Sequence, residues 1–250
     1  MNMRNRVPLT LLSLVFVISM SQVATAGTVY YNDYTGITVK FVNVRETTQS
    51  AGDPDVLFGA PTLSGDSLLF FPSNFTSQSV DGVSDQTHSL LQFTLEAKNN
   101  PSDFIDSFVF TELGDAVLTG TGSSVTRAEV GMSGYVTVTE DINGPTFVSI
   151  PFTGTINPTN PLNLEDNPGT TLWSGSVTVD VASYAPYAKV AVITFDNNLD
   201  THSEDGTSAM IQKKVINNQC ITIEVVVPEP STFVLATIGL LCLIIRRRQR

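Results

Sequence analysis

The segment between Asp196 and Gly206 is the part of the sequence richest in side chains that bind hard metal ions. Carboxylate and amide oxygens are the ligands that Ca²⁺ prefers in proteins. The segment begins like an EF-hand loop, but Thr201 and Thr207 stand where that motif has its glycine and its bidentate glutamate. We therefore predict a loop after a strand, either solvated or holding Ca²⁺ at a sheet edge. The candidate calcium ligands are Asp196, Asn198, Asp200, Glu204 and Asp205.

Catalytic chemistry has few candidates in this sequence. The acid pairs at 140–141, 165–166 and 204–205 suit the two carboxylates of a glycoside hydrolase, yet adjacent acids in loops are usually solvated. The histidines, His88 and His202, lack a second ligand at the spacing of a metal site, and His88 is expected at the start of a strand. We therefore predict no catalytic residues, a protein that is not an enzyme, and no cofactor besides the candidate Ca²⁺.

Aromatic side chains offer another kind of binding chemistry. Trp173, with Tyr184 and Tyr187, would suit stacking on the apolar face of a sugar ring if it were exposed. A lone Trp in a β-protein more often fills the core, and this is the interpretation we favour. Cys220 is expected to be a packed strand residue without a disulfide partner, because Cys242 lies in the C-terminal apolar run.

The elements that position these residues are predicted to be strands. Runs rich in Thr, Val, Ile and Phe alternate apolar and polar residues at 91–97, 104–110 and 177–181, with Gly, Pro and Asn turns between them. This pattern predicts an all-β fold, a single β-sandwich of jelly-roll type with about ten short strands. The residues predicted to be buried are Phe93, Leu95, Phe108, Phe110, Val177, Val179, Val190 and Val192.

The first 26 residues have the layout of a secretory signal peptide. Arg4 and Arg6 precede an apolar stretch, and Ala24-Thr25-Ala26 forms an A-x-A site for signal peptidase before Gly27. We therefore predict export, with cleavage between Ala26 and Gly27. The exported body then spans residues 27–227, long enough for one β domain with a sizeable core.

The predicted body is strongly acidic. Of the 13 Lys and Arg residues, two lie in the signal and four at the C-terminus, while only one of the 24 Asp and Glu residues lies beyond residue 227, so the body carries a formal charge near −16. Nucleic-acid binding requires Lys and Arg to neutralise phosphates, and an anionic membrane surface attracts the same residues. The charge therefore argues against both partners and suits a soluble surface protein.

The C-terminal 23 residues, 228–250, combine three features in a fixed order. Pro228-Glu229-Pro230 should be extended, because each proline fixes its own φ and disfavours helix before it. The uncharged run 233–245 is predicted to be a helix in the membrane, and at about 1.5 Å per residue it reaches roughly 20 Å, short of a hydrocarbon core about 30 Å thick. Arg246, Arg247 and Arg248 would stop it on the cytoplasmic side. Hydropathy alone leaves open a permanent anchor and a removable tail.

The order of these parts resembles the PEP-CTERM sorting signal of Gram-negative bacteria, over residues 227–250 only. The resemblance implies recognition by an exosortase, a transpeptidase-like membrane enzyme, and removal of the tail near Pro230. It also implies a transient membrane anchor and delivery across the inner membrane to the cell surface or extracellular matrix, where such proteins accompany exopolysaccharide.

Two functions are consistent with this sequence. The first is a non-enzymatic surface or matrix protein processed through its C-terminal signal. The second is a carbohydrate-binding or polysaccharide-active β-sandwich exported by the same route, with polysaccharide as its partner. An exposed Trp173 beside Tyr184 or Tyr187 would favour the second, and a Trp173 buried between the sheets would favour the first.

Overall fold

The computed structural model describes residues 27–98, 103–216, 218 and 221–227. The predicted signal peptide up to Ala26, Cys220, and the predicted sorting tail 228–250 lie outside the described residues. All the secondary structure within the described ranges is β-strand. This part of the chain contains no helix of the length and apolarity that a membrane span requires.

Two antiparallel eight-stranded sheets pack face to face. The first sheet has the order β1-β3-β7-β14-β9-β10, with β2 added to β3 and β12 to β9. Its strands are β1 (Thr28–Tyr30), β2 (Tyr34–Thr35), β3 (Val39–Thr48), β7 (Ser84–Ala97), β9 (Arg127–Asp141), β10 (Gly144–Thr153), β12 (Leu162–Asn163) and β14 (Ala188–His202).

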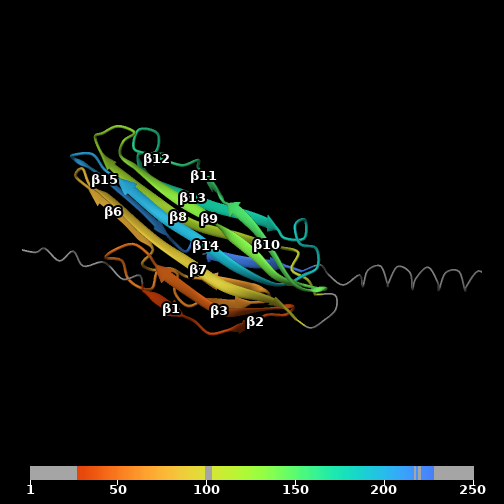
Figure 1. Ribbon diagram of the computed structural model, residues 1–250. Helices are drawn as coiled ribbons and strands as arrows, with labels where there is room; N and C mark the ends of the chain where they lie inside the picture. Colours follow the sequence, from red (N-terminus) through yellow and green to blue (C-terminus); the bar gives the residue numbers. More distant parts are fainter. Residues whose placement is uncertain (1–26, 99–102, 217, 219–220, 228–250) are drawn as a thin grey trace, which may run out of the picture.

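The second sheet has the order β11-β13-β8-β16-β5-β4, with β15 paired to both β8 and β6. Its strands are β4 (Thr62–Ser64), β5 (Ser67–Phe70), β6 (Thr76–Val80), β8 (Ser107–Gly120), β11 (Thr155–Asn157), β13 (Gly169–Asp180), β15 (Thr207–Lys213) and β16 (Ile221–Val226). Figure 1 shows the longest strands running side by side along an elongated sandwich, with β1, β2 and β3 along one edge.

Eight of these strands follow the jelly-roll order. One sheet contains β7-β14-β9-β10 and the other β6-β15-β8-β13, so that successive strands change sheets at every step except the β9–β10 hairpin. Strand β16 lies in line with β15, because β15 pairs with β8 over 114–120 and β16 pairs with β8 over 107–111. The prediction of an all-β, jelly-roll-like sandwich is confirmed.

The core lies between the sheets and is rich in phenylalanine. Phe110 of β8 stacks on Phe195 of β14 with ring centroids 4.3 Å apart, which joins the two sheets at the centre of the sandwich. Phe152 of β10 packs against both rings. Because side chains alternate between the faces of a strand, the buried positions repeat every second residue along each long strand.

The predicted core residues are buried on three of the four strands. Phe93, Leu95, Phe108, Phe110 and Val179 are buried, and Val177 is half-buried against the core. The prediction is wrong for Val190 and Val192, which are only half-buried, while the alternate residues Ala191 and Ile193 face the core. The stretch is apolar on both faces, and the pairing of β14 with β9 shifts register beside Val190, so the alternation gave the wrong phase.

Candidate functional site

The segment predicted as a calcium loop is a strand over most of its length. Strand β14 continues to His202, and Asp196, Asn198 and Asp200 lie on its solvent-facing side. The loop prediction is therefore wrong for residues 196–202. Glu204 and Asp205 follow in the tight connection to β15, which starts at Thr207.

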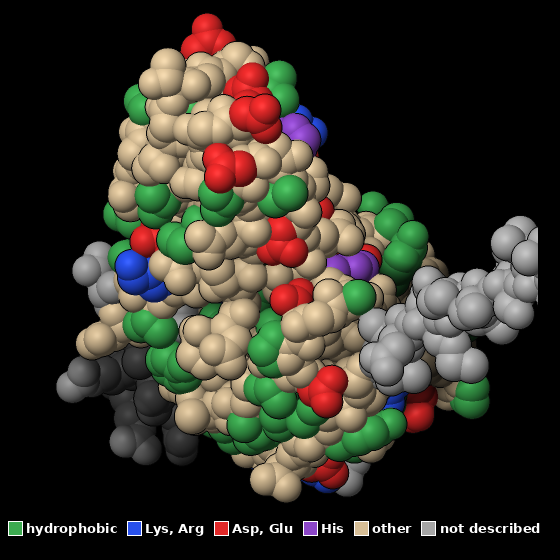
Figure 2. All heavy atoms as spheres, turned by 90° about the vertical axis from the view of Figure 1, so that its left-hand side faces the viewer, with side chains coloured by type: hydrophobic (Ala, Val, Ile, Leu, Met, Phe, Trp, Pro, Cys, Tyr) green, Lys and Arg blue, Asp and Glu red, His purple; other side chains and the backbone are tan. Residues whose placement is uncertain are grey.

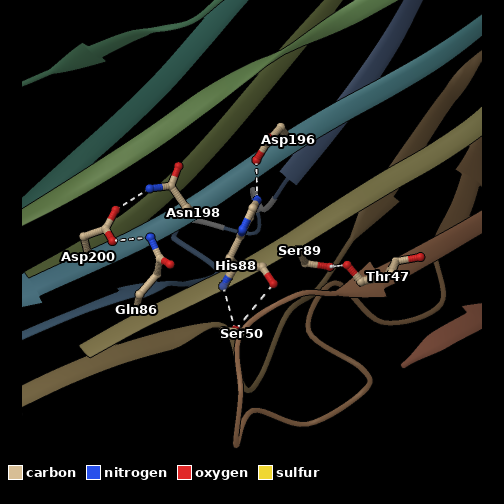
Figure 3. A network of polar contacts seen from close by, with 8 residues as sticks. All are labelled: Thr47, Ser50, Gln86, His88, Ser89, Asp196, Asn198 and Asp200. Atoms are coloured by element: carbon tan, nitrogen blue, oxygen red, sulfur yellow. Dashed lines mark hydrogen bonds and ion pairs between the residues drawn. The ribbon is translucent and has the colours of Figure 1, made fainter. Parts of the chain in front are cut away.

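The first sheet carries separate groups of polar contacts, shown in Figure 3, two of which involve the solvent-facing side chains of β7 and β14. His88 lies inside β7, not at its start, and its Nε2 lies 2.6 Å from Asp196 Oδ1 on β14. The Ser50 hydroxyl accepts a hydrogen bond of 2.9 Å from the His88 backbone N–H. This arrangement holds the loop after β3 against the centre of the sheet.

A shallow depression of about 440 Å³ lies farther along the same face. It is lined by residues of β7, β9 and β14, namely Ser84, Asp85, Gln86, Arg127, Glu129, Asp200, Thr201 and His202. Its polar groups are paired across the strands: Gln86 donates to Asp200 over 2.7 Å, and Ser84 contacts His202 Nδ1 over 2.6 Å. Asn198 donates a further bond to Asp200.

The five candidate calcium ligands do not converge on one point. Asp196 contacts His88, and Asp200 accepts from Gln86, as described above. Glu204 instead accepts bonds from the Ser123 backbone N–H over 2.7 Å and from the Thr126 hydroxyl over 3.2 Å. Across the described ranges, no group of three or more His, Cys, Asp or Glu side chains could hold a metal ion.

Glu204 has a structural role at the β14–β15 connection. The Ser123 backbone N–H, assisted by the hydroxyls of Ser123 and Thr126, holds the pKa of the Glu204 carboxyl below its usual range. The bonds tie the start of β15 to the turn before β9. The carboxylate is thus an acceptor for backbone and hydroxyl donors of its own chain.

The other acid pairs are also separate from one another. Asp141 ends β9 and accepts from the Asn143 backbone N–H over 2.6 Å. Asp166 belongs to an exposed turn and accepts from the Asn163 amide over 2.8 Å. Residues 140–141 lie at the end of β9 opposite to Arg127, which pairs with His202 beside Glu204. The pair at 140–141 therefore does not face the pair at 204–205 across a cleft.

The aromatic residues do not form one platform. Trp173 is 2 % exposed, within the core between the sheets, as the favoured interpretation predicted. Tyr184 and Tyr187 are 65 % and 55 % exposed, and Tyr187 packs its ring edge-on against Phe104 at 5.0 Å. The tryptophan is thus unable to stack on an external sugar ring together with these tyrosines.

A buried polar cluster that the sequence reasoning missed lies between the sheets. Glu112 of β8 and Lys213 of β15 form an ion pair whose two side chains are wholly inaccessible to solvent. Asn197 of β14 donates to the same Glu112 oxygen over 2.6 Å. The Lys213 ammonium also lies 4.9 Å from the ring centroid of Phe75 and 5.3 Å from that of Trp173.

The sequence did contain a signal for this cluster. Glu112 continues the buried phase of Phe108 and Phe110, and Asn197 stands between the buried residues Phe195 and Leu199. A charged or amide side chain at the core phase of an alternating strand must have a specific partner, because burial without one is costly. Burial lowers the pKa of the Lys213 ammonium, and the neighbouring Glu112 opposes that shift.

A second buried carboxylate has an architectural role. Glu46 of β3 accepts the backbone N–H groups of Leu57 and Phe58 over 2.7 and 2.8 Å, which fixes the loop that places Phe58 in the core. Burial raises the pKa of Glu46, and these two backbone bonds partly offset the rise.

Outside the core, Asp and Glu outnumber Lys and Arg on the face seen in Figure 2, in agreement with the acidic charge of the body.

Comparison with known protein families places a motif at the end of the chain. Residues 226–248 match the PEP-CTERM protein-sorting motif. The predicted resemblance is therefore confirmed for the C-terminal segment. The motif implies processing by an exosortase, export and sorting to the cell surface. Strand β16 ends at Val226, so the motif starts where the sandwich ends.

No curated protein is significantly similar to the chain. Among solved structures, the chain resembles those of infectious bursal disease virus at low similarity. The Gx strain structure is 12 % identical, with 72 % of this chain and 48 % of that chain covered and a TM-score of 0.14. The Gt strain structure is 14 % identical, with 82 % and 62 % covered and a TM-score of 0.13. The chain thus spans between about half and three-fifths of these structures.

Proposed function

We propose that this chain, which carries a PEP-CTERM protein-sorting motif at residues 226–248, is a non-enzymatic protein of the cell surface or extracellular matrix. Its β-sandwich is the delivered part, and the C-terminal segment anchors it transiently and is then removed by an exosortase. The motif match is the observation that carries the proposal. The acidic surface and the absence of Trp173 from that surface support a soluble body without a sugar-stacking platform.

The position of the motif suits such a processing step. The last buried residue of β16 is Val225, and the strand ends at Val226. Cleavage near Pro230 therefore leaves every strand of the sandwich intact. We expect Pro228-Glu229-Pro230 to offer extended backbone to an enzyme, since proline disfavours helix at the preceding residue.

Mass spectrometry of the protein from its native host tests this proposal. We expect a mature form that begins at Gly27 and ends near Pro230 in cells with an active exosortase. A triple alanine variant of Pro228, Glu229 and Pro230 should stay membrane-bound at full C-terminal length. A matched alanine variant of the exposed residues Glu140 and Glu165 should be processed normally. A wild-type mature form that retains Arg250 contradicts the sorting role and leaves a permanent anchor.

Binding measurements separate this role from carbohydrate recognition. The purified protein is tested against a panel of polysaccharides with and without Ca²⁺. The surface-protein proposal predicts no saturable binding that depends on the depression between β7, β9 and β14. Saturable binding that is lost in Asp200→Ala would instead favour the carbohydrate-binding alternative, because Asp200 lines that depression.

A further inference from the structure

The buried cluster of Lys213, Asn197 and Glu112 brings together an amine, a carboxamide and a carboxylate. All three residues are inaccessible to solvent or nearly so. The Lys213 Nζ and the Asn197 Nδ2 contact the same oxygen, Oε2 of Glu112. The amine nitrogen and the amide group are therefore neighbours, and each is in contact with a single proton-accepting atom.

The surroundings of the cluster favour reaction over simple ion pairing. Phe75 and Trp173 flank the Lys213 ammonium, and Phe195 precedes the amide by two residues on the core side of β14. Desolvation of this kind favours the neutral amine, which is the nucleophilic form. Fixed neighbours also remove the entropic cost of bringing the reacting groups together. Trp173 Nε1, Asn197 Oδ1 and Glu112 Oε1 are buried without a hydrogen-bond partner among the described residues.

From this geometry, we propose that the folded protein forms an intramolecular isopeptide bond between Lys213 Nζ and Asn197 Cγ, with Glu112 as the catalytic proton carrier. Glu112 takes a proton from the Lys213 ammonium, and the free amine attacks Asn197 Cγ. The protonated Glu112 then supplies the proton for the leaving Nδ2 as the Cγ–Nδ2 bond breaks, and its carboxylate takes the second proton from the Lys213 nitrogen. Glu112 therefore ends protonated and neutral beside the new secondary amide. One amide replaces another and one molecule of ammonia leaves, so no oxidant or other reactant is required.

The bond would change the energetics of the cluster and of the sandwich. A buried ion pair is costly, because desolvation of two charges can exceed their mutual attraction. Conversion to a neutral secondary amide removes the buried ammonium. The product joins β14 of one sheet to β15 of the other, in a body whose sole cysteine, Cys220, can form no internal disulfide. It would therefore be a covalent link between the two layers.

Peptide mass spectrometry of the purified full chain, folded and then denatured, tests the proposal. Trypsin does not cleave after an acylated lysine, so digestion with trypsin and a Glu-specific protease should yield peptides 190–204 and 205–214 as one joined species. Its mass should equal the summed masses of the two unlinked peptides minus the mass of one ammonia. Cyclisation of Asn197 to a succinimide also releases ammonia but joins no peptides. Two separate peptides from the folded wild type overturn the proposal.

Three variants isolate the chemistry. Lys213→Arg keeps the positive charge beside Glu112 but removes the amine, so the joined species should disappear while circular dichroism reports an unchanged fold. Glu112→Gln should abolish or slow the joining at least tenfold, and unchanged joining overturns its role as proton carrier. Lys214→Arg, at the exposed neighbouring lysine, is the matched control and should leave the joined species at the wild-type level.

Discussion

At the scale of single residues, the core contains charged and amide side chains that are held by specific partners. Lys213 is the clearest case, because its ammonium is fully buried and pairs with a fully buried carboxylate. Lys214, the next residue, pairs with Asp115 while half of its own side chain stays exposed. Loss of one partner from a buried pair leaves an uncompensated charge, whereas an exposed pair is screened by water. Removal of each of these two adjacent lysines should therefore have a very different effect on the free energy of unfolding.

This difference gives the first prediction. Lys213→Ala should lower the free energy of unfolding by about 3–5 kcal/mol relative to the ion-paired protein, because Glu112 is left charged and unpaired in the core, and by more relative to protein in which the isopeptide bond has formed. Lys214→Ala should lower it by no more than about 1 kcal/mol. Denaturant titration followed by fluorescence of Trp173 measures both. Equal losses for the two variants would contradict the burial of the Lys213 pair.

The second prediction concerns pH. The pKa of Glu204 is lowered in the folded state, chiefly by the Ser123 backbone N–H, so the unfolded chain binds its proton more readily. The contribution of Glu204 to stability is therefore present above the ordinary pKa of a glutamate and is lost as the pH falls through its lower folded-state value. The range from about pH 6 to about pH 3 spans this window. Between these pH values, the melting temperature should fall less in Glu204→Gln than in wild type. Glu165→Gln, in an exposed turn, should behave like wild type.

At the scale of elements, strand β14 shows what the sequence could and could not reveal. The alternation of apolar residues predicted the strands and the sandwich, and Trp173 was correctly interpreted as a core residue. The same rule missed the second half of β14, because Asn197 and Thr201 occupy buried positions where apolar residues are expected. Together with the Asp and Asn residues on the outer face, these buried polar residues gave the segment the composition of a loop. Cross-strand partners such as His88 for Asp196 depend on register, which the sequence did not indicate.

The third prediction follows from the separation of the candidate calcium ligands. A bound ion stabilises the folded state only where several oxygen donors converge on it. Asp196 and Glu204 are held by different partners on different parts of the sandwich. We therefore expect the melting temperature to be the same in excess chelator and in excess Ca²⁺. A rise in melting temperature with Ca²⁺ that is lost in Asp200→Asn would contradict this expectation and support a calcium site.

The fourth prediction tests the packing of β9 against β14. A Cβ at Gly134 would lie 2.1 Å from the Thr194 backbone oxygen and 2.6 Å from the Phe152 ring, so the strands would have to separate. At Gly131 the nearest atoms belong to the end of the Asn198 side chain, which can move aside. Gly134→Ala should therefore reduce the free energy of unfolding by about 1–3 kcal/mol or more, as overpacking does. Gly131→Ala should reduce it less, as measured by the same denaturant titration.

At the scale of the whole molecule, the folded body and the sorting motif meet with almost no spacer. The central strand of the second sheet, β8, is long enough to pair with β15 and β16 in succession. Strand β16 also pairs with β5 on its other side, so it is an internal strand of the sheet. The body is therefore complete only when it includes the chain up to Val226, which is also the first residue matched by the sorting motif.

The fifth prediction uses two truncations to locate this boundary. Removal of residues 228–250 should leave the melting temperature of the body unchanged, because the described strands end at Val226. Removal of residues 221–250 should unfold it. That deletion takes away Ile221, Ile223 and Val225, each at most 6 % exposed, and burial of such a side chain contributes about 1.5–3 kcal/mol. The combined loss, with the ladders to β8 and β5, is comparable to a typical total stability of about 5–15 kcal/mol. A cooperative melting transition in the shorter truncation product would show that β16 is dispensable and that the sandwich is complete without it.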